Sequence, residues 1–219
     1  MTGADRRVKR IAILISGRGS NMQALLDAEL PAQIAVVVSN NPSARGLETA
    51  RARSVSTEIV NHRDFADRAA FDLALAERLE RYRPDLIVLA GFMRVLTEGF
   101  IARYPGRILN IHPSLLPAFP GVDTHRRALE QGVRLHGCTV HFVTPALDHG
   151  PIVAQAAVAV LPDDDEAKLA ARVLEQEHRI YPQAVRWFVT GRLALQDGRV
   201  VIAGECSYPQ PVISPLAGA

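Results

Sequence analysis

Two polar side chains of one strand-length segment have the types and spacing of a pair that faces a ligand. The segment, residues 107–117, reads RILNIHPSLLP. Because successive side chains of a strand point to opposite faces, Asn110 and His112 share one face, while Leu109 and Ile111 share the other. The pattern predicts either a reactive pair at the end of a buried strand, where open α/β sheets bind ligands, or a hydrogen-bonded pair in the core.

Asp148 is the carboxylate that could complete this pair. It lies in the segment 145–151, PALDHGP, between two predicted strands. Alone it is typical of a turn. A carboxylate beside an imidazole favours the imidazolium and raises the pKa of the histidine. Asp148 therefore matters for chemistry only if folding brings it to His112, which spacing along the chain does not decide.

A glycine-rich turn, SGRGSN at residues 16–21, follows an apolar run and precedes a helical pattern. Glycines let a backbone approach an anion, and a helix N-terminus offers N–H groups and partial positive charge. The third glycine of the dinucleotide fingerprint is replaced by Met22, and residues 39–41 contain no acid that could bind a ribose. The turn predicts either a monophosphate site, with side-chain donors from Ser20 and Asn21, or a plain tight turn.

Three other polar residues have less decided roles. His125 follows a turn and could face a cleft. His141 alternates with Val140 and Phe142, so we expect it on the solvent face of a strand. Glu177 lies on the apolar stripe of a late helix, either at the helix edge or facing a polar ligand inside the fold.

The sequence predicts neither a metal centre nor a covalent intermediate. No histidine pair has the HExxH or a similar spacing, so no catalytic metal is expected. No serine or cysteine lies in a nucleophile-elbow context. Cys138 and Cys206 form no CxxC pair, which indicates two reduced thiols in a cytoplasmic protein.

The elements that must position these residues follow two patterns. In the first half, apolar strands alternate with amphipathic helices; the strands are expected at 10–16, 34–38, 86–90 and 107–111, the helices at 22–28, 45–53 and 67–82. This alternation predicts an α/β fold, a Rossmann-like and mostly parallel sheet with helices on both faces. The strand order is not readable from the sequence.

The second half predicts an antiparallel strand pair, 138–144 and 152–160, and then a long helix at 163–191 with an acidic start. Pro182 is expected to kink or break this helix. We expect an N-terminal tail at 1–9, a single domain at 10–203 and a poorly ordered C-terminal tail at 204–219.

Composition excludes several functional classes. The chain has 219 residues, 48% hydrophobic and 22% charged, with a formal net charge of +2. This charge balance gives no reason to expect a nucleic-acid partner. No apolar run approaches the roughly 20 residues of a membrane helix, and no signal peptide is visible. We expect a cytoplasmic protein without a membrane partner.

Several motifs taken together resemble a known family. They are SGRGSN at 16–21, AGFMR at 90–94, LNIHPSLLP at 109–117, HFV at 141–143 and DHGP at 148–151. In consistent order from about residue 10 to 191, they resemble the phosphoribosylglycinamide formyltransferases, folate-dependent enzymes of purine biosynthesis. The NxHPSLLP motif is shared across folate formyltransferases, whereas the SGxGSN loop is narrower. His149 departs from the family's common Asp-Gly-Gly and puts the shape of the folate loop in doubt.

The resemblance implies a role for each matching residue. Asn110, His112 and Asp148 match the catalytic trio. The residues that match the glycinamide ribonucleotide site are Gly19, Ser20, Asn21 and Glu177. Those that match the site of the co-substrate 10-formyltetrahydrofolate are Arg68, Met93, Arg94, Val95, Leu96, Asn110 and Thr144. The resemblance implies a monomer or homodimer that needs no metal.

The implied reaction is transfer of the formyl group of 10-formyltetrahydrofolate to the amine of glycinamide ribonucleotide. Three alternatives share features of the sequence. A formyltetrahydrofolate hydrolase carries an extra N-terminal domain, whereas here a strand is expected within about ten residues of Met1. A methionyl-tRNA formyltransferase carries an additional C-terminal domain and suits a more basic chain. A non-catalytic nucleotide-binding module would not need the trio.

Overall fold

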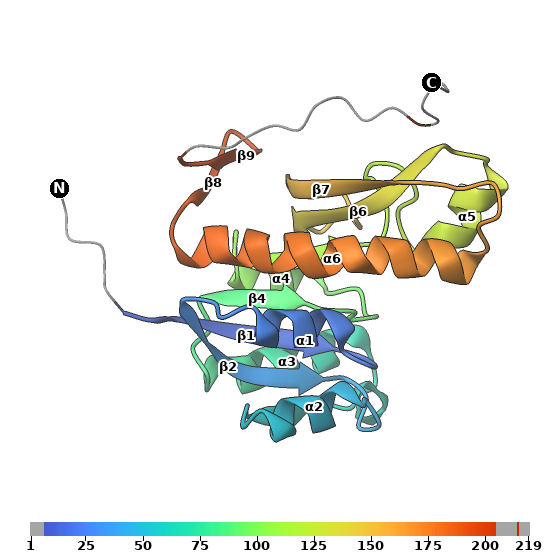
Figure 1. Cartoon of the computed structure of the whole chain (residues 1–219). Coiled ribbons are helices and arrows are strands. Elements are labelled where there is room, and N and C mark those ends of the chain that lie inside the picture. Colours follow the sequence, from blue (N-terminus) through green and yellow to red (C-terminus); the bar gives the residue numbers. More distant parts are fainter. Residues whose placement is uncertain (1–6, 205–213, 215–219) are drawn as a thin grey trace. The chain divides into compact units, whose positions relative to one another are not determined.

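The computed structural model of the chain describes residues 7–204 and 214 (Figure 1). These fall into two compact units that divide between Leu109 and Asn110. Most of the predicted C-terminal tail, including Cys206, lies outside the described residues, as do the first six residues of the predicted N-terminal tail.

The first unit is built on a parallel sheet. Its strands are β1 (Lys9–Ile15), β2 (Ala32–Ser39), β3 (Thr57–Ile59) and β4 (Leu86–Leu89), in the order β3-β2-β1-β4. Ile13 at the centre of β1 pairs with Val37 on one side and Val88 on the other. The predicted parallel sheet is confirmed. The three-residue strand β3 was not predicted, because it is too short and polar to give an apolar run.

Helices cover both faces of this sheet, as predicted. They are α1 (Ser20–Asp27), α2 (Gly46–Ala52), α3 (Arg68–Glu80) and α4 (Glu98–Arg103), with a 3-10 turn, η1 (His62–Asp64). Crossovers between parallel strands are right-handed. Because β2 and β3 lie to one side of β1 and β4 to the other, α1 and α2 pack on one face and α3 on the opposite face (Figure 1).

The core of the first unit joins α3 to the sheet through a predicted stripe. Phe71, Leu75 and Leu79, four residues apart, are fully buried. Asp67 starts the helix, since its side chain accepts the N–H of Ala70.

The division between the units falls within β5 (Ile108–His112). Just before this strand, within the first unit, the N–H of Ile87 donates to the Arg107 carbonyl at 2.8 Å. After α5 (Thr124–Glu130), β6 (Leu135–Phe142) pairs antiparallel with β7 (Ile152–Ala159). The predicted antiparallel pair is therefore confirmed. A hairpin of β8 (Leu193–Gln196) and β9 (Arg199–Ile202), which was not predicted, follows the last helix.

The last helix, α6 (Glu166–Val189), packs on β6 and β7. Asp165 caps its N-terminus by accepting the N–H of Lys168 at 2.8 Å. The helix runs on through Pro182, so the predicted break is wrong. Pro182 is buried with Tyr181 and Val185, and this packing holds the helix together despite the missing proline N–H.

Cys138 lies fully buried on β6. Burial raises the pKa of its thiol to about 12, and the charge of Glu177 on α6 adds to the effect. A thiol in this environment is chemically inert.

Within residues 7–204, no helix combines the length and the apolar character needed to cross a bilayer.

Candidate active site

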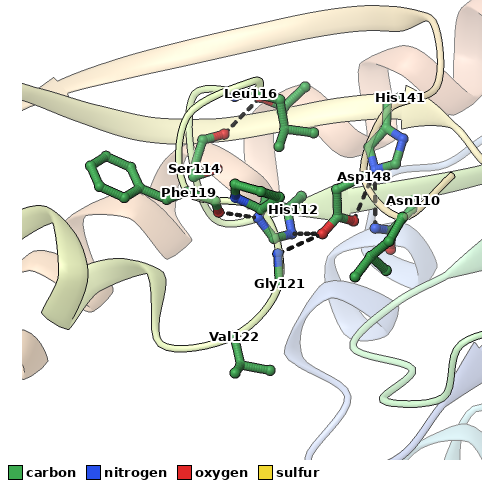
Figure 2. A network of polar contacts seen from close by, with 12 residues as sticks. Asn110, His112, Ser114, Leu116, Phe119, Gly121, Val122, His141 and Asp148 are labelled. Atoms are coloured by element: carbon green, nitrogen blue, oxygen red, sulfur yellow. Dashed lines mark hydrogen bonds and ion pairs between the residues drawn. The ribbon is translucent and has the colours of Figure 1, made fainter.

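His112, at the end of β5, is held from both sides by protein acceptors. It is 5% exposed, and its Nε2 lies 2.9 Å from the carbonyl oxygen of Phe119. Its Nδ1 lies 3.5 Å from Oδ2 of Asp148, as Figure 2 shows. A carbonyl can only accept, so Nε2 carries a hydrogen. An imidazolium, with a hydrogen on each nitrogen, is the state that satisfies both neighbours.

Asp148 reaches His112 from the loop between β6 and β7. Its backbone is left-handed, with φ of 52°, and its side chain is 8% exposed. The same Oδ2 that faces His112 accepts the N–H of Gly121 at 2.8 Å. Folding therefore brings Asp148 to His112, the condition that sequence spacing left open.

Asn110 lies two residues before His112 on β5, so the two side chains point to the same face of the strand. Its Nδ2 lies 3.2 Å from Nε2 of His141 on β6, and this same nitrogen of His141 lies 3.8 Å from Oδ1 of Asp148 (Figure 2). The second unit thus gathers a half-buried amide, two buried imidazoles and one buried carboxylate, which we call the Asn–His–Asp cluster: Asn110, His112, His141 and Asp148.

The prediction that His141 lies on a solvent face is wrong. Its side chain is 2% exposed, because β6 pairs with β7 and α6 packs on it, so seven of its eight residues are buried. Burial lowers the pKa of His141. The apolar flanks of His141, Val140 and Phe142, were the available signal: in a strand covered on both faces, alternation does not mark solvent.

The loop after His112 is tied to the antiparallel pair. Thr139 on β6 donates its hydroxyl to the Ser114 carbonyl at 2.6 Å and accepts the N–H of Leu116 at 3.0 Å. Gln155 on β7 donates to the carbonyl of Leu116 at 2.9 Å. These bonds explain the HPSLLP segment: its backbone groups are fixed so that Phe119 and Gly121 reach the cluster.

In the first unit, the predicted phosphate turn enters α1. Gly19 has φ of 77°, and a Cβ there would lie 3.2 Å from Cα of Gly46. Glycine suits this position for two reasons: the backbone is left-handed, and the backbone of Gly46 leaves little room for a Cβ. Ser20 is the first residue of α1, and Asn21, 8% exposed, is the second.

Ser16 connects the predicted phosphate turn to the predicted folate stretch at 93–96. Its hydroxyl accepts the N–H of Met93 at 2.8 Å and donates to Oδ1 of Asn40 at 2.6 Å. Its own N–H donates to the carbonyl of Gly91 at 3.1 Å. Loops after β1, β2 and β4 therefore share one hydrogen-bond network, in which Nδ2 of Asn40 also lies 3.2 Å from Nδ1 of His62.

The predicted folate residues of the first unit differ in exposure. Arg68, at the start of α3, is exposed, and so are Met93 (71%) and Val95 (43%), whereas Leu96 is buried. Arg94 lies over the ring of Phe71, with its guanidinium carbon 5.0 Å from the ring centroid. The stretch thus offers two exposed apolar side chains on an anchored backbone.

Comparison with known proteins identifies the family. The family model described as formyl transferase matches residues 9–185. This chain is a member of the formyl transferase family. It is 46% identical over 204 residues to the phosphoribosylglycinamide formyltransferase of Escherichia coli strain K12, covering 91% of this chain and 96% of that protein.

Solved structures agree with this assignment to the formyl transferases. The glycinamide ribonucleotide transformylase 1 of Symbiobacterium toebii superposes with a TM-score of 0.88 at 50% identity, over 90% of this chain and 95% of that one. A formyltetrahydrofolate deformylase of Pseudomonas syringae pv. tomato matches at 26% identity with a TM-score of 0.84, over 90% of this chain and 66% of that one.

The remaining predicted residues of this formyl transferase lie in the second unit. Glu177 is buried on α6, 6% exposed, so it is not the solvated helix-edge residue. Thr144 lies in the β6–β7 loop and donates its hydroxyl to the Ala146 carbonyl at 3.2 Å. His149 is exposed, and its Nδ1 lies 2.7 Å from the carbonyl oxygen of Leu147.

His125, which is half-buried, pairs with the buried His136. Its Nδ1 lies 3.2 Å from Nε2 of His136, and burial lowers the pKa of both rings, that of His136 to about 4. In the described residues of this formyl transferase, no group of three or more histidine, cysteine, aspartate or glutamate side chains has the arrangement of a metal site.

Proposed function

We propose that this chain transfers the formyl group of 10-formyltetrahydrofolate to the amine of glycinamide ribonucleotide in purine biosynthesis. The products are formyl-glycinamide ribonucleotide and tetrahydrofolate. The observation that carries the proposal is the meeting of His112 with Asp148, 3.5 Å apart, beside Asn110 on the same strand. Membership in the formyl transferase family and the similarity to a phosphoribosylglycinamide formyltransferase over most of both chains support it.

The chemistry is direct acyl transfer. The amine nitrogen attacks the formyl carbon, forming a C–N bond while the carbonyl π electrons move to oxygen. The tetrahedral intermediate then breaks its bond to N10 of the folate, and N10 takes up a proton as the amine gives one up. Such a step needs oxyanion stabilisation and a proton acceptor, and it needs no nucleophilic side chain.

The cluster supplies both requirements. The positive charge of His112 and an N–H of Asn110 stabilise the oxyanion, and one such donor is worth about 2.7–4 kcal/mol. Asp148 orients the His112 ring through Nδ1 and, directly or through water, takes the proton that the amine sheds. Within the buried cluster these charges act more strongly than in water.

We assign glycinamide ribonucleotide to four residues. The phosphate is bound by Gly19, Ser20 and Asn21, where a glycine of positive φ precedes the N-terminus of the eight-residue α1. Glu177 contacts the same substrate.

We assign 10-formyltetrahydrofolate to the residues that match the family's folate site. The exposed apolar side chains of Met93 and Val95 suit contact with a flat ring. The full set is Arg68, Met93, Arg94, Val95, Leu96, Asn110 and Thr144. We expect a monomer or homodimer that acts in the cytoplasm.

One assay tests the reaction against its alternatives. The protein is mixed with 10-formyltetrahydrofolate, with and without glycinamide ribonucleotide, and deformylated folate is followed. Product that requires the acceptor supports the transferase, whereas product without the acceptor indicates the hydrolase, and no product indicates a binding module. The Asp148→Asn protein is the control, since it keeps the fold and loses the carboxylate.

A further inference from the structure

His141 is a buried titratable side chain to which the proposed mechanism gives no role. Its Nδ1 lies 2.9 Å from the carbonyl oxygen of Phe142, and its Nε2 lies 3.2 Å from Nδ2 of Asn110. Figure 2 shows the ring with one dashed line to Asn110 and another to Asp148. Nε2 also lies 3.8 Å from Oδ1 of Asp148, which is farther than the amide. The nearest neighbours are therefore the Phe142 carbonyl for Nδ1 and the Asn110 amide for Nε2, and they determine where the hydrogens lie.

The Phe142 carbonyl fixes the tautomer. A carbonyl oxygen only accepts, so Nδ1 of His141 carries a hydrogen and donates it. The ring is otherwise shielded from water, and burial lowers the pKa of His141 even though Asp148 and the Phe142 carbonyl act in the opposite direction. The nearby His112 further disfavours a second positive charge. At neutral pH the ring is uncharged, and Nε2 presents a lone pair.

This lone pair fixes the amide of Asn110. Nε2 can only accept, so the group that faces it must be the amide nitrogen and not the amide oxygen. A flipped amide would set the Oδ1 lone pairs against that of Nε2. A primary amide carries two N–H donors, and His141 takes one of them.

The loop of Asp148 also supports this arrangement. A Cβ at Gly150 would lie 1.7 Å from the Phe142 carbonyl oxygen, so only glycine allows the oxygen to occupy its place. The backbone N–H of Phe142 donates to the Pro151 carbonyl at 2.9 Å. The segment that brings the carboxylate to His112 thus also makes room for the acceptor that sets the tautomer of His141.

We propose that His141 is a positioning residue for formyl transfer: it accepts one N–H of Asn110 and so holds the amide with its second N–H ready for the developing oxyanion. This role rests on the proposed function. Orientation of an oxyanion donor before reaction removes the cost of turning it during reaction.

Two substitutions at His141 separate an acceptor from a space-filling side chain. His141→Leu removes the acceptor and fills the site, whereas His141→Gln can place an amide oxygen near the position of Nε2. We expect His141→Leu to lower kcat about 10-fold to 100-fold, part of the 10²–10³-fold effect of losing an oxyanion donor, with KM for both substrates changed less than about 3-fold. His141→Gln should recover most of kcat. A higher kcat for His141→Gln than for His141→Leu would contradict a role in packing alone. Equal losses of kcat in the two variants would overturn the proposal.

A double-mutant cycle with Asn110→Ala tests whether His141 acts through the amide. Without the amide, His141→Leu should change kcat less than about 2-fold further. The same 10-fold to 100-fold loss in both backgrounds would overturn the proposal, because it would show an effect independent of Asn110.

A measurement on the unaltered protein tests the tautomer without turnover and without a variant that must fold. Nitrogen-15 NMR of the histidines at pH 7.5 should show Nδ1 of His141 protonated and Nε2 unprotonated. An imidazolium at that pH, or a hydrogen on Nε2, would overturn the proposal even in an active enzyme. Conversely, a protein that shows this tautomer but no acceptor-dependent turnover would reject the proposed function and leave the geometry intact.

Discussion

The two units hold polar networks of opposite character. In the first unit, Ser16, Asn40 and the N–H of Met93 are joined through neutral groups at the ends of parallel strands. In the second, the buried side chain of Asp148 lies 3.5 Å from His112 and 3.8 Å from His141, which are also buried. Neutral donors bind and orient a ligand, whereas buried ionisable groups stabilise charge and move protons. Substitutions at the phosphate turn of the first unit should therefore change KM, and those within the Asn–His–Asp cluster of the second unit should change kcat.

The largest effect is expected for Asp148→Asn. The amide keeps the size of the side chain but removes the charge that faces Nδ1 of His112. We expect kcat to fall about 10²–10⁴-fold while glycinamide ribonucleotide still binds. Steady-state kinetics and calorimetric titration of the substrate measure the two effects. Turnover within a few-fold of the unaltered protein would contradict the role of the carboxylate.

Asn110→Ala should have the next largest effect. Loss of the N–H donor should lower kcat about 10²–10³-fold and leave KM for glycinamide ribonucleotide within about 3-fold. The measurement is steady-state kinetics with saturating folate. A variant that changed only KM would place Asn110 with the binding residues and remove the contrast between the units.

Gly19→Ala tests the opposite side of the comparison. A Cβ at this left-handed position meets Gly46, so the turn must deform. We expect KM for glycinamide ribonucleotide to rise about 10-fold, corresponding to about 1.4 kcal/mol of strain or lost contact, with kcat little changed.

Gly17→Ala is the matched control for Gly19→Ala. Gly17 lies in the same turn, but it has no positive φ and a Cβ there would meet nothing within 4 Å. The Gly17→Ala protein should keep a KM for glycinamide ribonucleotide and a kcat close to those of the unaltered protein. Equal effects at the two glycines would show that the turn acts by its flexibility rather than by the position of Gly19.

The smallest effect on turnover is expected for Asp164→Asn. This variant tests whether a residue of the second unit that lies outside the Asn–His–Asp cluster changes stability without changing kcat. Asp164 makes two contacts of 2.7 Å with Arg172 on α6, and these hydrogen bonds are the largest cause that lowers its pKa to about 2. We expect the free energy of unfolding at pH 7 to fall by about 1.5–3 kcal/mol with kcat unchanged.

The pH dependence of that loss has a defined sign. The pKa of Asp164 is about 2 in the folded protein and about 3.9 in an unfolded chain. The stabilisation is therefore complete above about pH 4 and is lost as the pH falls toward 2. Urea unfolding of the two proteins should differ at pH 7 and converge as the pH is lowered through this range. A constant difference would show that the pair stabilises α6 without its charge.

Sequence patterns predicted what depends on local periodicity. Alternation placed Asn110 and His112 on one face, and four-residue spacing buried Phe71, Leu75 and Leu79. The mostly parallel sheet, the antiparallel pair and the long helix follow from the same rules.

The features that sequence did not predict depend on tertiary contacts. Asp148 reaches His112 through a left-handed turn that spacing along the chain does not encode. His141 was assigned to solvent because its strand was treated as covered on one face only. Pro182 was expected to interrupt a helix that packing on the sheet holds together. In each case the rule was local, and the packing around the residue determined the outcome.

The reaction rate of the buried Cys138 thiol can report how often β6, the strand that carries His141, opens to solvent. A thiol reagent attacks the thiolate, which burial suppresses in the closed protein. Labelling must then wait for β6 to separate from its neighbours, and the labelling rate reports the free energy of that event. In a Cys206→Ser background the signal comes from Cys138 alone. If glycinamide ribonucleotide or folate slows the labelling, the ratio of the rates with and without that ligand gives the increase in the free energy of opening of β6.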